Sequence, residues 1–117
     1  MNYVDGFVVA VPAAKRELYR DHAARAAAIM KENGALRVVE CWGDDVPAGK
    51  LTDFRRAVQA TEDEIVVFSW IEYPSKAARD AAWARFMADP RMEEMGAQMP
   101  FDGKRLILGG FQAILDD

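Results

Sequence analysis

The segment Glu64–Tyr73, EIVVFSWIEY, constrains the fold more than any other stretch of the chain. Its β-branched and aromatic residues, closed by Pro74, predict a strand. Alternate residues of a strand point to opposite faces of a sheet, and here both faces are largely apolar. One face carries Ile65, Val67, Ser69, Ile71 and Tyr73, and the other carries Val66, Phe68, Trp70 and Glu72. A sheet with one solvated face alternates apolar and polar residues, so this strand is expected to be covered on both sides.

The remaining elements follow from composition and from turn formers. Gly34 follows a run of strong helix formers as a C-cap, Ser75 can cap a second helix, and Asp89-Pro90 ends it. The expected strands are Tyr3–Val11, Leu36–Trp42, Glu64–Tyr73 and Arg105–Leu115, with Phe54–Val58 as a short extra strand, and the expected helices are Ala13–Asn33 and Lys76–Ala88, with one more turn at Met92–Met95. This β-α-β-β-α-β order predicts a single α+β, ferredoxin-like domain over residues 1–117, with an antiparallel four-stranded sheet and two helices on one face.

Two helices can cover only one face of such a sheet. The last expected strand repeats the two-sided apolar pattern, with Ile107, Phe111, Ala113 and Leu115 on one side and Leu106, Leu108 and Ile114 on the other. The uncovered face is then a larger apolar patch than a soluble monomer usually exposes. A second copy of the same sheet is the simplest cover, because two-fold dimers are the commonest oligomers. We therefore expect an obligate homodimer joined sheet to sheet.

Composition excludes several classes of protein. The 117 residues carry a formal net charge of −4 and contain no run of lysine and arginine, so nucleic acid is not an expected partner. Cys41 is the sole cysteine, which rules out an intrachain disulfide and disfavours a secreted framework. The N-terminal sequence lacks the features of a signal peptide, and no apolar stretch is long enough for a membrane helix. A cytoplasmic protein without membrane contact is expected.

Several segments together resemble one known family: YVDGFVV (3–9), GALRVVECW with DDVPAGK (34–50), VVFSWIEYPS (66–75), DPRM (89–92), MPFDGKR (99–105) and GGF (109–111). On these segments the chain resembles the YbaA-like family of small bacterial proteins, a family of unknown function within the dimeric α+β barrel superfamily. The resemblance implies the fold and the dimer, and it implies no cofactor. Enzymes and ligand-sensing domains of the superfamily often hold their ligands between sheet and helices, so the resemblance implies a location for a site and leaves the chemistry open.

His22 is the only histidine, the side-chain type that exchanges a proton near neutral pH, so it is the candidate general base. The spacing of Leu18, His22 and Ile29 turns it toward the sheet. The alternative is a histidine that is simply hydrogen-bonded to a neighbour in or near the core. One histidine does not build a conventional zinc site, and no metal is expected.

Strand parity gives the candidate ligand-binding residues. Glu40 shares a face with Trp42, and carboxylates beside indoles can lie in partly desolvated sites that hold a proton near neutral pH. The full set of candidates is Glu40, Trp42, Phe68, Trp70 and Glu72. The alternative is that both carboxylates lie at the solvated rim or pair with Arg37 or Arg105.

The other conspicuous residues are interpreted as structural. Cys41 has no nucleophile signature and is expected to act as a small hydrophobic residue. Asp44-Asp45 lacks the spacing of a calcium loop and suits a turn. Lys104-Arg105 is expected at a solvated edge or beside acids, and Gly109-Gly110 is expected to mark a bulge or close packing.

Two classes of function remain open. The first is a small enzyme or binding protein for a compact apolar or aromatic metabolite, held between the first helix and the sheet, with His22 as base and aromatic residues lining the site. This reading requires a pocket of roughly 300 Å³ or more beside His22. The second is a non-catalytic dimeric structural or interaction module.

Overall fold

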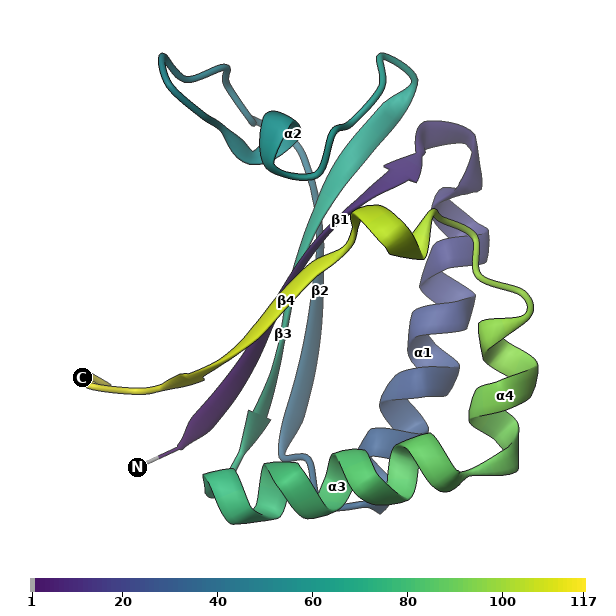
Figure 1. Cartoon of the computed structure of the whole chain (residues 1–117), viewed down its shortest axis with the longest axis vertical. Helices are drawn as coiled ribbons and strands as arrows, with labels where there is room; N and C mark the ends of the chain where they lie inside the picture. The colour runs from purple at the N-terminus through teal and green to yellow at the C-terminus, as the bar shows by residue number, and fades with distance from the viewer. Residues whose placement is uncertain (1) are drawn as a thin grey trace.

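The computed structural model describes residues 2–117 and contains one antiparallel sheet with the strand order β2-β3-β1-β4 (Figure 1). The elements in chain order are β1 (Tyr3–Pro12), α1 (Arg16–Glu32), β2 (Arg37–Trp42), α2 (Phe54–Ala57), β3 (Glu64–Tyr73), α3 (Lys76–Ala88), α4 (Pro90–Gly96) and β4 (Ile107–Gln112), with short 3₁₀ turns at Ala13–Lys15 and Gly103–Arg105. The predicted α+β, ferredoxin-like fold is confirmed. Among residues 2–117, no helix is both long and apolar enough to cross a bilayer.

The longer helices α1, α3 and α4 lie on one side of the sheet (Figure 1). In Figure 1 the sheet is seen almost edge-on, with α1 and α4 to its right and α3 running from below its lower end toward the right, whereas α2 and the C-terminal tail extend to its left. Because α4 joins α1 and α3, three helices cover the face for which two were expected. We call this the helix face, and the opposite side the open face.

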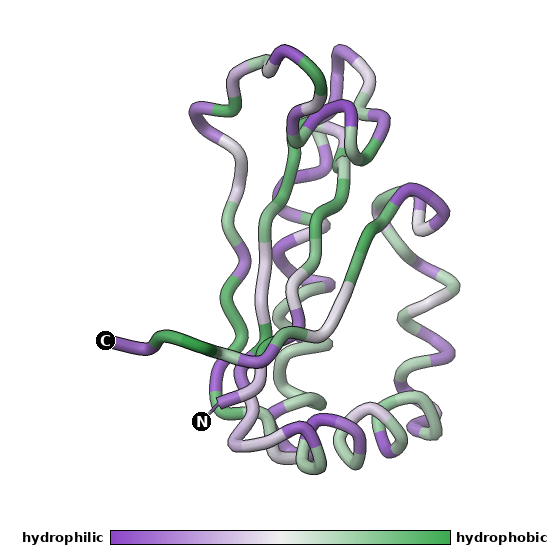
Figure 2. The backbone as a smooth tube through the Cα atoms, turned by 60° about the vertical axis from the view of Figure 1, so that its left-hand side comes forward, coloured by the Kyte–Doolittle hydropathy of each residue, from purple (hydrophilic) through white to green (hydrophobic). Residues whose placement is uncertain are grey.

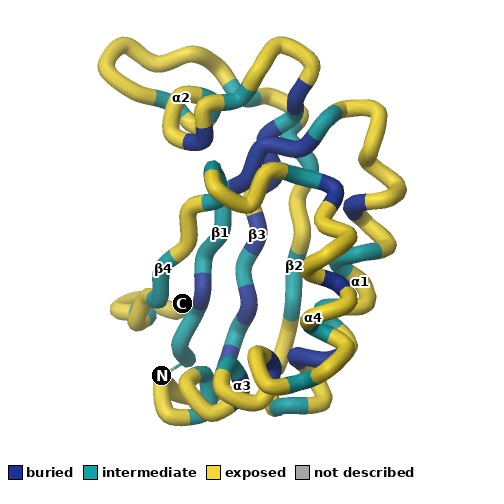
Figure 3. The backbone as a smooth tube through the Cα atoms, turned by 45° about the vertical axis from the view of Figure 1, so that its right-hand side comes forward, coloured by how far each residue is buried: buried dark blue, intermediate teal, exposed yellow. Residues whose placement is uncertain are grey.

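The central strands β1 and β3 pair along their whole length, from Tyr3 opposite Tyr73 to Pro12 opposite Glu64. Buried positions are concentrated on these two strands, which β2 and β4 flank (Figure 3). Figure 2 shows hydrophobic positions along the strands and again in the C-terminal tail. The packed interior lies between the sheet and the helices, and its fully buried residues include Val9, Val11, Val67, Tyr73, Met30 and Ala82.

The expected extra strand at Phe54–Val58 is wrong, because Phe54–Ala57 forms the single helical turn α2. Asp53 decides this locally: its Oδ1 accepts a hydrogen bond at 2.7 Å from the backbone N–H of Arg56. A carboxylate that satisfies a first-turn N–H is a helix N-cap, and it favours a turn over an extended chain.

The last strand is shorter than the expected Arg105–Leu115. At its start, Asp102 accepts a hydrogen bond from the N–H of Lys104 and begins a 3₁₀ turn. At its end, Gln112 pairs with Tyr3, the first residue of β1, so no strand remains beside the tail to continue the ladder.

The unbroken register shows that Gly109-Gly110 is not a bulge. A Cβ at Gly110 would collide with the side chains of Tyr3 and Arg79, so the glycine allows close packing, one of the two readings expected for it.

Candidate functional site

A cavity of about 140 Å³ lies between α1 and the sheet, at the place expected for a ligand. Three alanines of α1, spaced so that they face the sheet, border it: Ala23, Ala26 and Ala27. Their short side chains leave room that larger residues would fill. The other lining residues are mostly apolar, from β1, β2, β3, α3 and the segment before β4, and the polar ones are Tyr19, His22, Glu40, Ser69 and Trp83. The expectation of a pocket of roughly 300 Å³ or more beside His22 is wrong, because the cavity has about half that volume.

Tyr19 and Glu40 form the closest polar contact of this cavity. The Tyr19 hydroxyl donates a hydrogen bond of 2.5 Å to Oε1 of Glu40. Burial raises the pKa of Tyr19 above its ordinary value, and the carboxylate beside it raises it further. Glu40 as a whole residue is exposed on the edge strand β2, but its carboxyl group is turned toward α1. Desolvation there raises the pKa of Glu40, and this effect outweighs the lowering by Tyr19 and Ser69. The pair therefore places a proton donor and a carboxyl group at the cavity wall.

His22 lines the same cavity and has a partner in the chain. Its Nε2 lies 3.0 Å from the backbone oxygen of Met95, and its ring is perpendicular to that of Phe101 at 6.3 Å between centroids. If Nε2 carries the proton and donates to Met95, the neutral ring keeps Nδ1 as its acceptor. His22 is therefore hydrogen-bonded to a neighbouring residue, which is the alternative that was given to its role as a general base.

A second hollow, the outer groove, runs along the outside of α1 beside the edge strand β2 and has a volume of about 430 Å³. Its lining residues are Arg16, Tyr19, Arg20, Ala23, Ala24, Ala27, Val38, Glu40, Cys41, Trp42 and Val67. Five of them, Tyr19, Ala23, Ala27, Val38 and Glu40, also line the cavity. The two spaces therefore lie on the two sides of one wall.

The five expected ligand-binding residues do not form one site. Glu40 and Trp42 lie on the helix face, and Glu40 is opposite Ser69 in the ladder. Phe68, Trp70 and Glu72 point to the open face, where they border a hollow of about 820 Å³. Successive residues of β3 alternate between faces, so within one chain a ligand in the cavity contacts Glu40 but not Phe68, Trp70 or Glu72, and Trp42 lines the outer groove instead.

Glu72 is held by neighbours on the open face. Its Oε2 accepts a hydrogen bond of 3.0 Å from the indole N–H of Trp70 and lies 3.7 Å from Arg37 Nη1. The pairing with Arg37 is the alternative that the sequence left open for this carboxylate. Cys41 is exposed, contrary to the expectation of a buried thiol, because it belongs to the edge strand β2, where it is opposite Phe68.

Asp5, which was not among the expected site residues, is a carboxylate that is only 1% exposed on the helix face. Tyr73 Oη and Trp83 Nε1 donate to its Oδ2 at 2.8 and 2.6 Å, and Arg79 Nε donates to its Oδ1 at 3.0 Å. The Arg79 guanidinium also lies 5.2 Å over the ring of Tyr3. The position of Asp5 as the one charged residue in the otherwise apolar run YVDGFVV could have indicated a buried, partnered carboxylate. With its oxygens occupied, Asp5 fastens α3 to the sheet.

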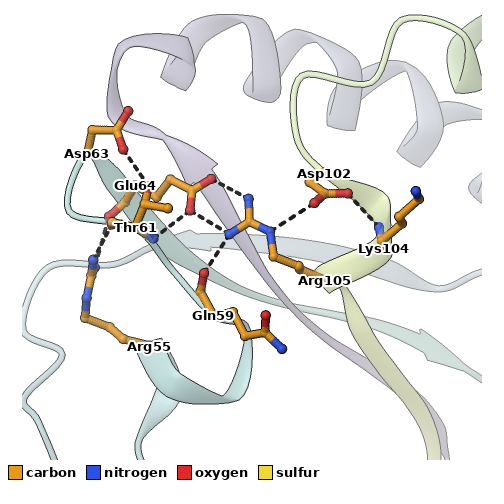
Figure 4. Close-up of polar contacts among 8 residues, drawn as sticks. All are labelled: Arg55, Gln59, Thr61, Asp63, Glu64, Asp102, Lys104 and Arg105. Carbon is orange, nitrogen blue, oxygen red and sulfur yellow. Dashed lines mark hydrogen bonds and ion pairs between the residues drawn. The ribbon is translucent and has the colours of Figure 1, made fainter.

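The MPFDGKR segment is also structural (Figure 4). Arg105 donates through both terminal nitrogens to the buried Glu64, at 2.8 and 2.7 Å, and through Nε to Asp102 at 3.1 Å. These bonds with Arg105 lower the pKa of Glu64 to about 2. Arg105 is thus a partner for acids, as one reading expected. No group of three or more His, Cys, Asp or Glu side chains that could hold a metal ion occurs within residues 2–117.

Known proteins resemble the chain in sequence and in fold. The uncharacterized protein YbaA of Escherichia coli strain K12 is 67% identical over 117 residues, which is the whole of both chains. Among solved structures, SnoaB, a cofactor-independent oxygenase from Streptomyces nogalater, has a TM-score of 0.61 at 15% identity and covers 98% of this chain and 95% of its own. A dimeric ferredoxin-like protein from an uncultured marine organism has a TM-score of 0.61 at 13% identity, covering 99% and 98%. Both likenesses concern the fold alone, which is α+β and ferredoxin-like. The family described as "Protein of unknown function (DUF1428)" matches residues 2–103, and the chain belongs to this family.

Proposed function

We propose that the protein is a homodimer joined through its open faces, and that each chain binds a compact apolar or aromatic small molecule between α1 and the sheet. The cavity beside Tyr19, Glu40 and His22 is the observation that carries the binding function. A cavity of about 150 Å³ in a protein core is large enough for benzene, so 140 Å³ suits a ligand of one aromatic ring. The few polar groups on an apolar lining are typical of small-molecule sites.

The open face supports the homodimer. Its hollow is lined mainly by apolar side chains of β1, β3, β4 and the tail, among which Phe68 is 45% exposed, Phe111 61% and Leu115 82%. Apolar side chains so exposed on one concave surface mark an interaction site. One of the proteins with the same fold is described as dimeric. A two-fold axis brings this surface against its own copy, which buries the same side chains on both.

Size-exclusion chromatography with light scattering tests the dimer. We expect a mass of twice 13.1 kDa at micromolar protein concentration. A mass of 13.1 kDa across the concentration range contradicts the dimer.

Thermal unfolding with neutral one- and two-ring probes, namely benzene, phenol and indole, tests the cavity. A ligand that binds only the folded state raises the midpoint, because binding removes folded protein from the unfolding equilibrium. In the variant Ala26→Leu, the larger side chain occupies the cavity, and the shift is expected to disappear. Ala28→Leu is the matched control, since Ala28 is on the same helix and lines neither the cavity nor the outer groove.

The second candidate is the non-catalytic dimeric module. Two observations favour it: the small volume of the cavity, and the bond of His22 to Met95. Under this function none of the neutral probes shifts the midpoint of the wild-type protein, while the dimer persists. A shift in wild type and Ala28→Leu, lost in Ala26→Leu, excludes the module as the whole function.

A further inference from the structure

The outer groove carries positive charge at one end. Arg16 and Arg20 lie one turn apart on α1 and both line it. Among residues 2–117 neither guanidinium forms an ion pair or hydrogen bond, whereas Arg79, Arg91 and Arg105 are each bound to carboxylates. The chain has a net charge of −4, so two unpaired arginines in one hollow are a local exception.

Aromatic surface lies next to these arginines. The Arg16 guanidinium lies 5.6 Å from the centroid of the Trp42 ring, and Trp42 lines the groove as well. Guanidinium groups bind carboxylates through two parallel hydrogen bonds and can remain stacked on an indole while doing so. Arg16, Arg20 and Trp42 thus present charge and an aromatic face to the same ligand.

The groove and the cavity adjoin at two polar residues. Tyr19 and Glu40 line both spaces, and the hydrogen bond between them joins α1 to β2. The groove of about 430 Å³ is charged at its outer end, and the adjoining cavity of about 140 Å³ is mostly apolar.

We propose that the ligand is an aromatic or apolar monocarboxylic acid, whose carboxylate is held by Arg16 and Arg20 in the outer groove and whose apolar body reaches the cavity between Tyr19 and Glu40. This inference rests on the proposed function, because it names the ligand class of the same site. Desolvation raises the pKa of the Glu40 carboxyl group, which lines the same groove.

The three tryptophans separate the possible binding places. Trp42 lines the outer groove, Trp83 the cavity and Trp70 the open face. Their indole N–H signals in a ¹⁵N–¹H correlation spectrum, assigned with single Trp→Phe variants, report each place separately. Phenylacetate and its neutral analogue phenylacetamide are suitable probes, since they differ in the charge of the head group.

We expect phenylacetate to shift the Trp42 and Trp83 signals together and saturably, and to bind about tenfold more tightly than phenylacetamide, the typical gain from charge-assisted hydrogen bonds. The double variant Arg16→Gln/Arg20→Gln is expected to lose this preference. Arg25→Gln, on the same helix but outside both spaces, keeps it.

Three outcomes overturn the inference. If phenylacetate and phenylacetamide bind equally tightly, Arg16 and Arg20 do not bind the carboxylate. If the Trp83 signal shifts and the Trp42 signal does not, the ligand binds in the cavity and the outer groove is not part of the site. Absence of any shift excludes aromatic acids as the ligand class. In each case the neutral probes and Ala26→Leu decide separately whether the cavity binds ligands, so failure of this inference is distinguishable from failure of the proposed function.

Discussion

The two faces of the sheet consist of alternate residues of the same strands, but they differ in what their side chains meet. On the helix face, Asp5 and Glu40 find hydrogen-bond partners, and most apolar residues of the central strands are buried. On the open face, Phe68 and Phe111 point into a hollow that is open to solvent. Within residues 2–117, no buried side-chain nitrogen or oxygen lacks a partner. The helix face is therefore covered within one chain, whereas much of the open face remains exposed.

The largest expected effect lies on the helix face, at Asp5. Asp5→Asn removes the buried carboxylate that Arg79, Tyr73 and Trp83 bind, and breaking a buried ion pair costs about 4 kcal/mol. We expect the free energy of unfolding in urea to fall by about that amount at fixed protein concentration. Asp80→Asn is the control, because Asp80 also binds Arg79 but lies at the surface, where a lost ion pair costs about 0–1 kcal/mol. Equal effects at the two positions would remove the distinction between a buried clamp and a surface pair.

The next effect tests the open face directly. Phe111→Asp places a carboxylate where the proposed dimer excludes water, so we expect the association of two chains to weaken by about 3 kcal/mol, or over 100-fold. Sedimentation velocity across a dilution series measures this change. Gln112→Asp, the next residue of β4, points to the other face and should leave association unchanged. If Phe111→Asp behaves like its neighbour, the open face is not an interface.

Glu64 gives a pH-dependent comparison. Its folded-state pKa of about 2 lies below the ordinary value of 4.5, so the bond to Arg105 stabilises the fold above pH 4.5 and loses that contribution as the pH falls toward 2. We expect Glu64→Gln to cost about 2 kcal/mol at pH 6, the typical value of hydrogen bonds to charged groups, and progressively less below pH 4.5. Urea unfolding at pH 6, 4 and 3 follows this closing gap. The exposed Glu62→Gln provides the baseline, and a gap that stays constant with pH contradicts the assigned role of Glu64.

The smallest effect concerns the wall of the cavity. Tyr19→Phe removes one hydrogen bond to Glu40 and should lower the free energy of unfolding by about 1 kcal/mol. The pKa of Glu40 should rise further, since the bond from Tyr19 lowers it. Carboxyl ¹³C titration of Glu40 in both proteins measures this shift. An unchanged or lower pKa would show that the bond does not form in solution.

Local signals were sufficient where neighbouring residues determine the structure. The strand Glu64–Tyr73 and the helix Lys76–Ala88 have the bounds that were predicted, because Pro74, Ser75 and Asp89-Pro90 act on their own neighbours. The error at Phe54–Val58 arose in a mixed apolar and basic segment, where only the side-chain bond of Asp53 selects a helical turn. The last strand was overestimated because its end depends on where β1 begins, which is a matter of pairing between distant segments.

The candidate site was predictable only in part. Strand parity correctly placed Glu40 beside Trp42 and Glu72 beside Phe68 and Trp70, but it did not show that the two groups lie on opposite faces, and all five were taken as one candidate set. Tyr19 was missed because its partner Glu40 is 21 residues away on another element. A tyrosine above a stripe of alanines on α1 was the signal that could have indicated it.

The sequence by itself determined the order of elements, the apolar character of both sheet faces and the residues that share each face, because these depend on side-chain periodicity along one segment. Only the tertiary structure decided that Asp5 would be bound by Tyr73, Arg79 and Trp83, that His22 would meet Met95, and that Arg16 and Arg20 would border a hollow beside Trp42. Each of these joins residues from different elements. Such contacts depend on how helices and strands pack in space, and no local pattern specifies the distance between two segments that meet only when the chain has folded.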